Sequence, residues 1–275
     1  MQAYVTPTEF QAHPTGLNVG DLVVGGDAAA QTAELALLTQ QASSMVDQWV
    51  FYRMGAQSYT ETRFVRPDNY GNLRVRLRQF PVQSITTAQW RLSARTGWQA
   101  INLAMIDLFP TLETGHQYVA SDFAYGVLSG WGQPPLTVHT TYVAGYPNAQ
   151  LTQAVVAGAT SLTVDTTIGM TLGETLTLYD GVSWEQVIID PTGTLTATTV
   201  PLASGTLFAH AVGVRVADLP EAVSLATIYA TAWLIKERRA GGGLMMGGKV
   251  QTTNFQSAED MELFRRLLLP YRRVI

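Results

Sequence analysis

The spacing of apolar residues predicts three long helices. In residues 27–54 apolar side chains recur at three- and four-residue steps and form one stripe (Leu35, Leu38, Ala42, Met45, Val46, Trp49, Val50, Tyr52). Asp27 is suited to cap the start of this helix and Gly55 to end it. Similar stripes predict helices over residues 220–240 and from Ser257 to about residue 269. A short helical turn is expected after Thr6, with Thr6 as its N-cap.

Alternating patterns predict strands between the first two long helices. Residues 59–66 alternate, and residues 73–78 place Leu73, Val75 and Leu77 on one face and Arg74, Arg76 and Arg78 on the other. The turn-forming sequence of residues 67–72 joins the two runs, so a β-hairpin with an arginine face is expected. Further strands are expected at residues 84–92 and 136–143.

A change of composition interrupts this framework. The strand at 136–143 ends in Ala144-Gly145-Tyr146-Pro147, and the next helix begins only at Leu219-Pro220. The residues between are rich in Thr, Val, Leu and Gly, and six short strands are expected there (161–164, 174–179, 184–190, 194–199, 206–208, 212–216). We therefore expect an α+β protein: residues 1–150 and 218–275 form a small helical bundle with a β-hairpin and strand region. Residues 151–217, the β-module, form an inserted all-β barrel or sandwich.

Charge is scarce and segregated along the chain. Only 14% of residues are charged, against about a quarter in typical proteins, which favours a surface that packs against neighbours and also fits a neutral soluble protein. Residues 1–52 carry five acids and no Lys or Arg, whereas residues 53–98 carry eight Arg and two acids. In residues 151–218, Arg215 is the single base among six acids. Regions of opposite charge on one chain favour a defined orientation against copies of itself or against other partners. The eight arginines of residues 53–98 fit a solvated face or contact with nucleic acid equally well.

Candidate chemistry is sparse, so we expect no enzyme activity, no cofactor and no metal site. The chain has no cysteine, and its four histidines share no metal-ligand spacing. Residues 243–249 have the glycine and lysine spacing of a phosphate-binding loop, but Val250 stands where the magnesium ligand belongs. The acids Asp180, Glu185 and Asp190 flank one predicted hairpin and would bind calcium weakly if at all. No apolar run is long enough to span a membrane, and the N-terminus does not resemble a signal peptide, which favours a protein made in the cytoplasm.

The order of the motifs resembles that of tailed-phage head–tail connector (adaptor or head completion) proteins. The front half, from helix 27–54 through the strands to Phe80-Pro81-Val82, is similar to the front half of that family. The segment from Val138 to Pro147 is the closest local match, because its Ala-Gly-Tyr end leads in the family to a Leu-Pro and a helix ending in Arg. Here residues 219–239 supply that helix after the β-module. The end, Leu-Pro-Tyr-Arg-Arg at 269–273, also resembles the family terminus.

This resemblance implies a virion protein of the head–tail interface. Such proteins form a ring, commonly of twelve copies, that docks under the portal, extends the DNA channel and receives the next neck or tail protein, a stopper or tail terminator. The family's C-terminal segment often inserts into the portal, which here implies a docking segment of Leu269, Pro270, Tyr271, Arg272 and Arg273. In such a ring, Arg74, Arg76 and Arg78 are candidates for a DNA-channel or inter-subunit face, with non-specific contact to passing DNA. No membrane partner is expected.

Two other classes of function stay open at this stage. The β-module would suit a glycan- or surface-binding tail-associated protein, since Trp184 lies beside the predicted turn at Asp180-Gly181 and an exposed aromatic ring stacks on sugars. A hydrolase also stays open, because the members of a catalytic triad meet only in space and His116, His139 or His210 would be its histidine.

Overall fold

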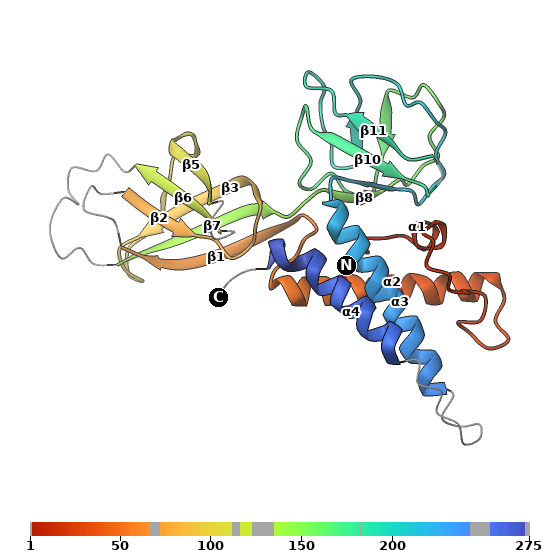
Figure 1. The fold of residues 1–275 in the computed structure, drawn as a ribbon. Coiled ribbons are helices and arrows are strands. Elements are labelled where there is room, and N and C mark those ends of the chain that lie inside the picture. The colour runs from red at the N-terminus through yellow and green to blue at the C-terminus, as the bar shows by residue number, and fades with distance from the viewer. Residues whose placement is uncertain are drawn as a thin grey trace. The chain divides into compact units, whose positions relative to one another are not determined.

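The structure, a computed structural model, describes residues 2–66, 72–111, 116–122, 135–181, 183–242 and 254–272. The chain divides into two compact units. The first unit comprises residues 1–51 and 147–272, and the second comprises residues 52–146. Helices and antiparallel sheets occur together, which confirms the expected α+β class (Figure 1). The predicted boundary between a connector domain and an inserted β-module remains a prediction.

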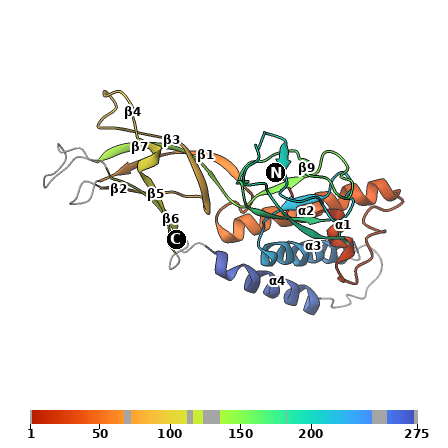
Figure 2. The same cartoon turned by 90° about the horizontal axis from the view of Figure 1, so that it is seen from above.

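The helices of the first unit are α1 (Pro7–Ala12), α2 (Ala28–Val50), α3 (Glu221–Gly242), α4 (Asn254–Leu268) and the 3-10 turn η3 (Leu269–Tyr271). The predicted caps are confirmed: Thr6 and Glu9 form a capping box, and the Asp27 carboxylate accepts from the amide of Ala30 at 2.8 Å. Apolar burial holds the helices together, with Leu35 and Leu38 of α2 packed against Ile235 of α3. Figure 2 shows α3 between α2 and α4 from a second side.

Three helix ends differ from the predictions. The α2 helix stops at Phe51, which takes the left-handed conformation at φ 67°, rather than at Gly55. The α3 helix runs on through Gly241, because one glycine costs a helix only about 1 kcal/mol. The α4 helix begins at Asn254, ahead of the predicted cap at Ser257, since residues 254–257 contain no Gly or Pro to stop it. The rest of the glycine-rich segment, 243–253, lies outside the described residues.

The β-module is all-β, as predicted. Its strands are β9 (Ser161–Thr163), β10 (Thr175–Tyr179), β11 (Glu185–Ile188), β12 (Thr199–Pro201) and β13 (Arg215–Ala217). The preceding strand β8 (Asn148–Gln150) completes a sheet of order β11-β10-β13-β8, and β12 pairs with β9. A separate core fills the module (Leu151, Leu162, Val164, Leu176, Leu178, Val187, Ile189, Val200, Val216). Strands predicted at 194–199 and 206–208 are wrong; the amides of Leu207 and Phe208 donate to the Glu185 carboxylate instead of to a strand.

The two ends of the β-module lie side by side. Strand β13 pairs antiparallel with β8, so that Ala217 stands opposite Asn148. One residue further on, the amide of Asp218 donates to the carbonyl of Pro147 at 3.1 Å. The chain therefore leaves toward α3 from the place where it entered the module, as an insertion requires.

The second unit contains two antiparallel sheets. One has the order β1 (Gln57–Val65), β7 (Leu136–Ala144), β3 (Val82–Arg91) and β4 (Gln99–Ala100). The other has the order β2 (Asn72–Arg76), β6 (His116–Asp122) and β5 (Ile106–Thr111), and the 3-10 turn η1 (Leu103–Met105) precedes β5. A shared core contains Trp90, Val138 and Tyr142.

The predicted hairpin between residues 59–66 and 73–78 is wrong. Strand β1 pairs with β7 along its whole length, from Gln57 opposite Ala144 to Val65 opposite Leu136, and β2 pairs with β6. Alternation defines the two faces of a strand but not its partner, and the six-residue connection is too long to enforce a tight hairpin. The strand predicted at 84–92 is confirmed as β3.

Gly145 explains the Ala-Gly-Tyr end of β7 in physical terms. Its φ is +105°, which side chains of L-residues rarely adopt. A Cβ at this position would lie 2.6 Å from the carbonyl oxygen of Gly55. The close approach is needed because the amide of Tyr146 donates to the carbonyl of Met54 at 2.7 Å.

Candidate assembly surfaces

The C-terminal segment continues from α4 into the turn η3, and Arg272 at the end of this turn lies over two aromatic rings. The guanidinium carbon of Arg272 is 4.7 Å from the ring centroid of Trp49 and 5.4 Å from that of Phe51. Leu269 is 64% exposed, and Pro270 is also exposed. Of the predicted docking residues, Arg273 lies outside the described residues.

Trp49 and Phe51 form an aromatic seat for this segment at the end of α2. The Phe264 ring meets the Trp49 ring edge-on at 6.2 Å, and the Arg265 guanidinium carbon lies 5.4 Å from the Trp49 centroid. Each exposed cation–π contact contributes about 0.5–1 kcal/mol. The apolar stripe of the sequence placed Trp49 in the core, and no local pattern marked Trp49 and Phe51 as a seat for a cation.

The predicted arginine face is exposed where the structure describes it. Arg76 and Arg78 are exposed, and Val75 and Leu77 are 4% and 1% exposed, so the alternation is confirmed. Arg74 lies in β2 opposite Ala120, but its side chain is outside the described part. Whether this face meets DNA or a neighbouring subunit stays a prediction.

A partly buried carboxylate on β1, that of Glu61, supports the chain next to that face. Glu61 accepts from Arg63 at 2.7 Å, from the amide of Arg78 at 3.0 Å, and from the Tyr142 hydroxyl in a short hydrogen bond. Burial, followed by the hydrogen bond to Glu61, raises the pKa of Tyr142 above its ordinary value. Glu61 therefore holds the backbone at Arg78 in place, and its carboxylate is itself held by the side chains of Arg63 and Tyr142.

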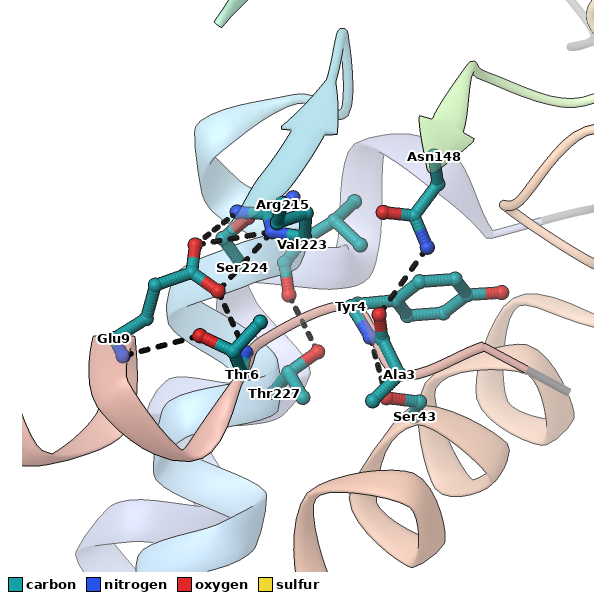
Figure 3. Close-up of polar contacts among 10 residues, drawn as sticks. All are labelled: Ala3, Tyr4, Thr6, Glu9, Ser43, Asn148, Arg215, Val223, Ser224 and Thr227. Carbon is teal, nitrogen blue, oxygen red and sulfur yellow. Dashed lines mark hydrogen bonds and ion pairs between the residues drawn. The ribbon is translucent and has the colours of Figure 1, made fainter. Parts of the chain in front are cut away.

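The lone base of the β-module is fully buried against the helices (Figure 3). The Nε atom of Arg215 donates to both carboxylate oxygens of Glu9, at 3.0 and 3.2 Å, and its Nη2 donates to Glu9 at 2.7 Å. Nη2 also donates to Ser224 Oγ of α3 at 3.3 Å, and the Tyr179 ring lies 3.9 Å from the guanidinium carbon. One arginine thus ties β13 of the module to α1 and α3.

The Glu9 carboxylate takes part both in the ion pair with Arg215 and in the N-terminal cap of α1. Its carboxylate accepts from the amide of Thr6 at 2.6 Å, and this bond completes the capping box of α1. Nearby, the Asn148 side chain donates to the carbonyl of Ala3 at 3.2 Å (Figure 3). The N-terminal segment is therefore held by polar contacts from the module as well as by its own apolar packing.

A second buried charge cluster lies inside the β-module. His210 has both ring nitrogens against carboxylates: Nδ1 is 2.9 Å from Asp180 and Nε2 is 2.7 Å from Glu185. Both contacts are satisfied when both nitrogens donate. Two of the three acids considered for weak calcium binding are thus engaged with His210, and Asp190 instead accepts from the Thr192 amide at 2.8 Å. In the described ranges no group of three or more acids and histidines is arranged to hold a metal ion.

Two carboxylates at the junction of module and α3 have raised pKa values. Burial raises the pKa of Asp218, and burial together with repulsion from Asp218 raises that of Glu174, although hydrogen bonds from Thr171 oppose this. A carboxylate whose pKa is higher in the folded state contributes stability at low pH and loses it as pH rises through the folded pKa.

We expect Asp218→Asn to stabilise the protein at neutral pH. The substitution removes a charge that is costly when folded, so the gain should be near zero at pH 4 and reach about 0.5 kcal/mol or less at pH 7 after solvent screening. Urea unfolding of both proteins across this pH range measures it. A gain that does not grow with pH would contradict the assigned cost of burying the Asp218 charge.

Comparison with known proteins adds little to these observations. No family model matches the chain, and no curated protein matches it. A solved chain from the neck of an empty GTA particle, computed with C6 symmetry, aligns over 98% of this chain and 94% of its own length. The identity is 13% and the TM-score is 0.41, a similarity too low to carry an argument about function. Within the described ranges no helix combines the length and apolar character needed to cross a membrane.

Proposed function

We propose that this chain is a structural protein of a tailed-phage neck, with no catalytic role. It forms a ring, of twelve copies by family resemblance, between portal and tail. The ring extends the DNA channel and offers a docking surface to the next neck or tail protein. The finished protein resides in the virion.

The adjacency of the module ends is the observation that supports this proposal most directly. The resemblance to connector proteins requires the Ala-Gly-Tyr strand end to lead into the Leu-Pro helix. The bond from the Asp218 amide to the Pro147 carbonyl brings the two sides of the insertion together as that order requires. The aromatic seat under Arg272 adds a second support, because it holds the proposed docking segment at a defined place on the first unit.

Native mass spectrometry of the full chain, alone and mixed with the cognate portal, tests the proposal. We expect closed oligomers that bind the portal ring. A chain that stays monomeric at all concentrations and never joins the portal would overturn it.

The docking segment gives a sharper test. Arg272→Glu should lower portal affinity by about ten- to a hundredfold, because hydrogen bonds to charged groups contribute about 1.5–3 kcal/mol. The matched control is Arg95→Glu, an exposed arginine of the second unit. Arg272→Glu should lower the free energy of unfolding by about 2 kcal/mol or less, since it loses two exposed cation–π contacts, and Arg95→Glu by about 0.5 kcal/mol or less. Unchanged portal affinity in Arg272→Glu would exclude docking through this segment.

A further inference from the structure

The sheet β1-β7-β3-β4 of the second unit has one face in the core and one face toward solvent. Residues directly opposite each other in antiparallel strands point to the same side, so the strand pairings define four rows on the solvent side. The rows are Phe64, Thr137 and Arg91; Thr62, His139 and Gln89; Thr60, Thr141 and Thr87; and Ser58, Val143 and Ser84. We call these four rows the outer sheet face. The alternate residues Tyr59, Trp90 and Tyr142 pack in the core, on the side of the second sheet, which Figure 2 shows as a separate layer.

The outer sheet face carries no carboxylate in its four rows, and Arg91 is the one arginine there. Its threonines bond across the strands: the Oγ atoms of Thr60 and Thr141 are 3.2 Å apart, and Thr62 Oγ lies 3.0 Å from His139 Nδ1. Most of this face is therefore uncharged and rich in hydroxyl groups, and its chemical contrast lies at the row of Arg91.

Aromatic rings gather at the row of Arg91. The ring of Trp98, which directly precedes β4, covers the Arg91 guanidinium, whose carbon is 4.2 Å from the ring centroid. The His139 ring lies 5.4 Å from the same ring, between centroids. Trp98 is 39% exposed, and Phe64, in the same row as Arg91, is 80% exposed. Because Phe64 and Arg91 are two strands apart, their backbones lie about 10 Å from each other. Two exposed rings therefore stand at one end of the outer sheet face.

Three arginines without an acidic partner lie at this same end. Arg66 follows β1, two residues beyond Phe64, and Arg95 lies in the turn that follows β3; both are exposed. The ion pairs of the described residues involve other bases, so no described carboxylate neutralises Arg66, Arg91 or Arg95. The Nε atom of Arg91 is also buried without a hydrogen-bond partner in the described part of the chain. We call Phe64, Arg66, Arg91, Arg95 and Trp98 the aromatic–arginine site.

The chemistry of the aromatic–arginine site matches a nucleic-acid strand with unpaired bases. A guanidinium donates two parallel hydrogen bonds to a phosphate, and an exposed ring stacks on a base of any sequence. A duplex hides the faces of its bases, so Trp98 and Phe64 have no role in binding one. A neutral glycan needs acceptors for its hydroxyl protons, and the four rows offer no carboxylate for them while the arginines only donate.

We propose that the aromatic–arginine site binds single-stranded nucleic acid, with bases stacked on Trp98 and Phe64 and phosphates bound by the three arginines. Arg91 occupies one face of the Trp98 ring and so holds the other face ready for a base. The inference goes beyond the proposed neck role and does not rest on it, because that role concerns duplex DNA in a channel.

Fluorescence anisotropy of the full chain with a labelled oligothymidine of about 16 nucleotides tests the proposal. A duplex of the same length and hyaluronate, an acidic glycan, are the competing probes, and we expect the single strand to bind more tightly than either. Trp98→Ala and Phe64→Ala should each weaken binding about five- to a hundredfold, the loss expected for one base stack. The matched control is Trp184→Ala, a tryptophan of the β-module that is 63% exposed, and it should leave the affinity unchanged. The high exposure of Phe64 keeps the test valid if Trp98→Ala disturbs the fold.

Salt dependence tests the arginines. Each phosphate contact of a single strand contributes about 0.7 to the slope of log affinity against log salt concentration. Arg66→Gln and Arg95→Gln should therefore each reduce that slope by about 0.7. The matched control is Arg76→Gln, an exposed arginine of β2 on the other sheet, which should leave the slope unchanged.

Four results would overturn the proposal. They are no binding of the single strand at low salt; equal binding of the duplex, unchanged in Trp98→Ala and Phe64→Ala; a slope reduced by Arg76→Gln but not by Arg66→Gln; and tighter binding of hyaluronate that Trp98→Ala abolishes. The last result would assign the site to an acidic glycan. The portal experiment decides the neck role separately, because the docking segment contains no residue of the aromatic–arginine site.

Discussion

Replacement of Arg215 by methionine is expected to lower the free energy of unfolding of the first unit by about 3–5 kcal/mol. The arginine is fully buried and donates three times to the Glu9 carboxylate. Methionine fills similar space but leaves that carboxylate, itself 9% exposed, without its cation. Removal of one partner of a buried ion pair is costly because the other charge stays desolvated. Urea unfolding of the full chain measures the loss.

The double variant Glu9→Gln with Arg215→Met separates the cost of the orphaned charge from the loss of packing. Glutamine still completes a capping box with Thr6, so α1 keeps its cap. We expect the double variant to recover more than half of the loss, a coupling of at least about 2 kcal/mol in a double-mutant cycle. The matched control, exposed Arg95→Met, should change stability by about 0.5 kcal/mol or less. An Arg215→Met variant as stable as this control would show that the ion pair does not hold the module to α1 and α3.

The helices were predictable because their apolar stripes need no distant partner to be recognised. The stripe of α2 and the caps at Thr6 and Asp27 are local patterns, and all are confirmed. The two faces of a strand were predictable from an equally local pattern, as the burial of Val75 and Leu77 shows. The partner of each strand could not be predicted from such local patterns. Strand β1 pairs with β7 across some eighty residues of sequence, and alternation carries no information about the register between distant strands.

The buried polar sites were beyond prediction for a related reason. Composition marked Arg215 as the one base of the β-module but gave no sign that its partner is Glu9, 206 residues away. Asp180 and Glu185 suggested a turn or weak cation binding, and the histidine that engages both lies 25–30 residues further on. The aromatic seat of Arg272 depends on α4 folding back along α3 so that its C-terminal end reaches Trp49 and Phe51, which the helix pattern alone does not specify.

Replacement of Glu185 by methionine is expected to destabilise the β-module by about 3 kcal/mol or more. The carboxylate accepts from the amides of Leu207 and Phe208 and lies 2.7 Å from His210 Nε2, and each buried polar group left without a partner costs about 1–3 kcal/mol. The loss should be local first, because residues 203–208 have no strand ladder to hold them. Amide hydrogen exchange should therefore accelerate at residues 206–210 before global unfolding changes.

The neighbouring exposed residue gives the control. Gln186→Met places the same side chain on the outer face of β11, where it should leave exchange at residues 206–210 unchanged. Slow exchange at residues 206–210 in Glu185→Met would mean that apolar packing, and not the buried carboxylate, holds this segment in place.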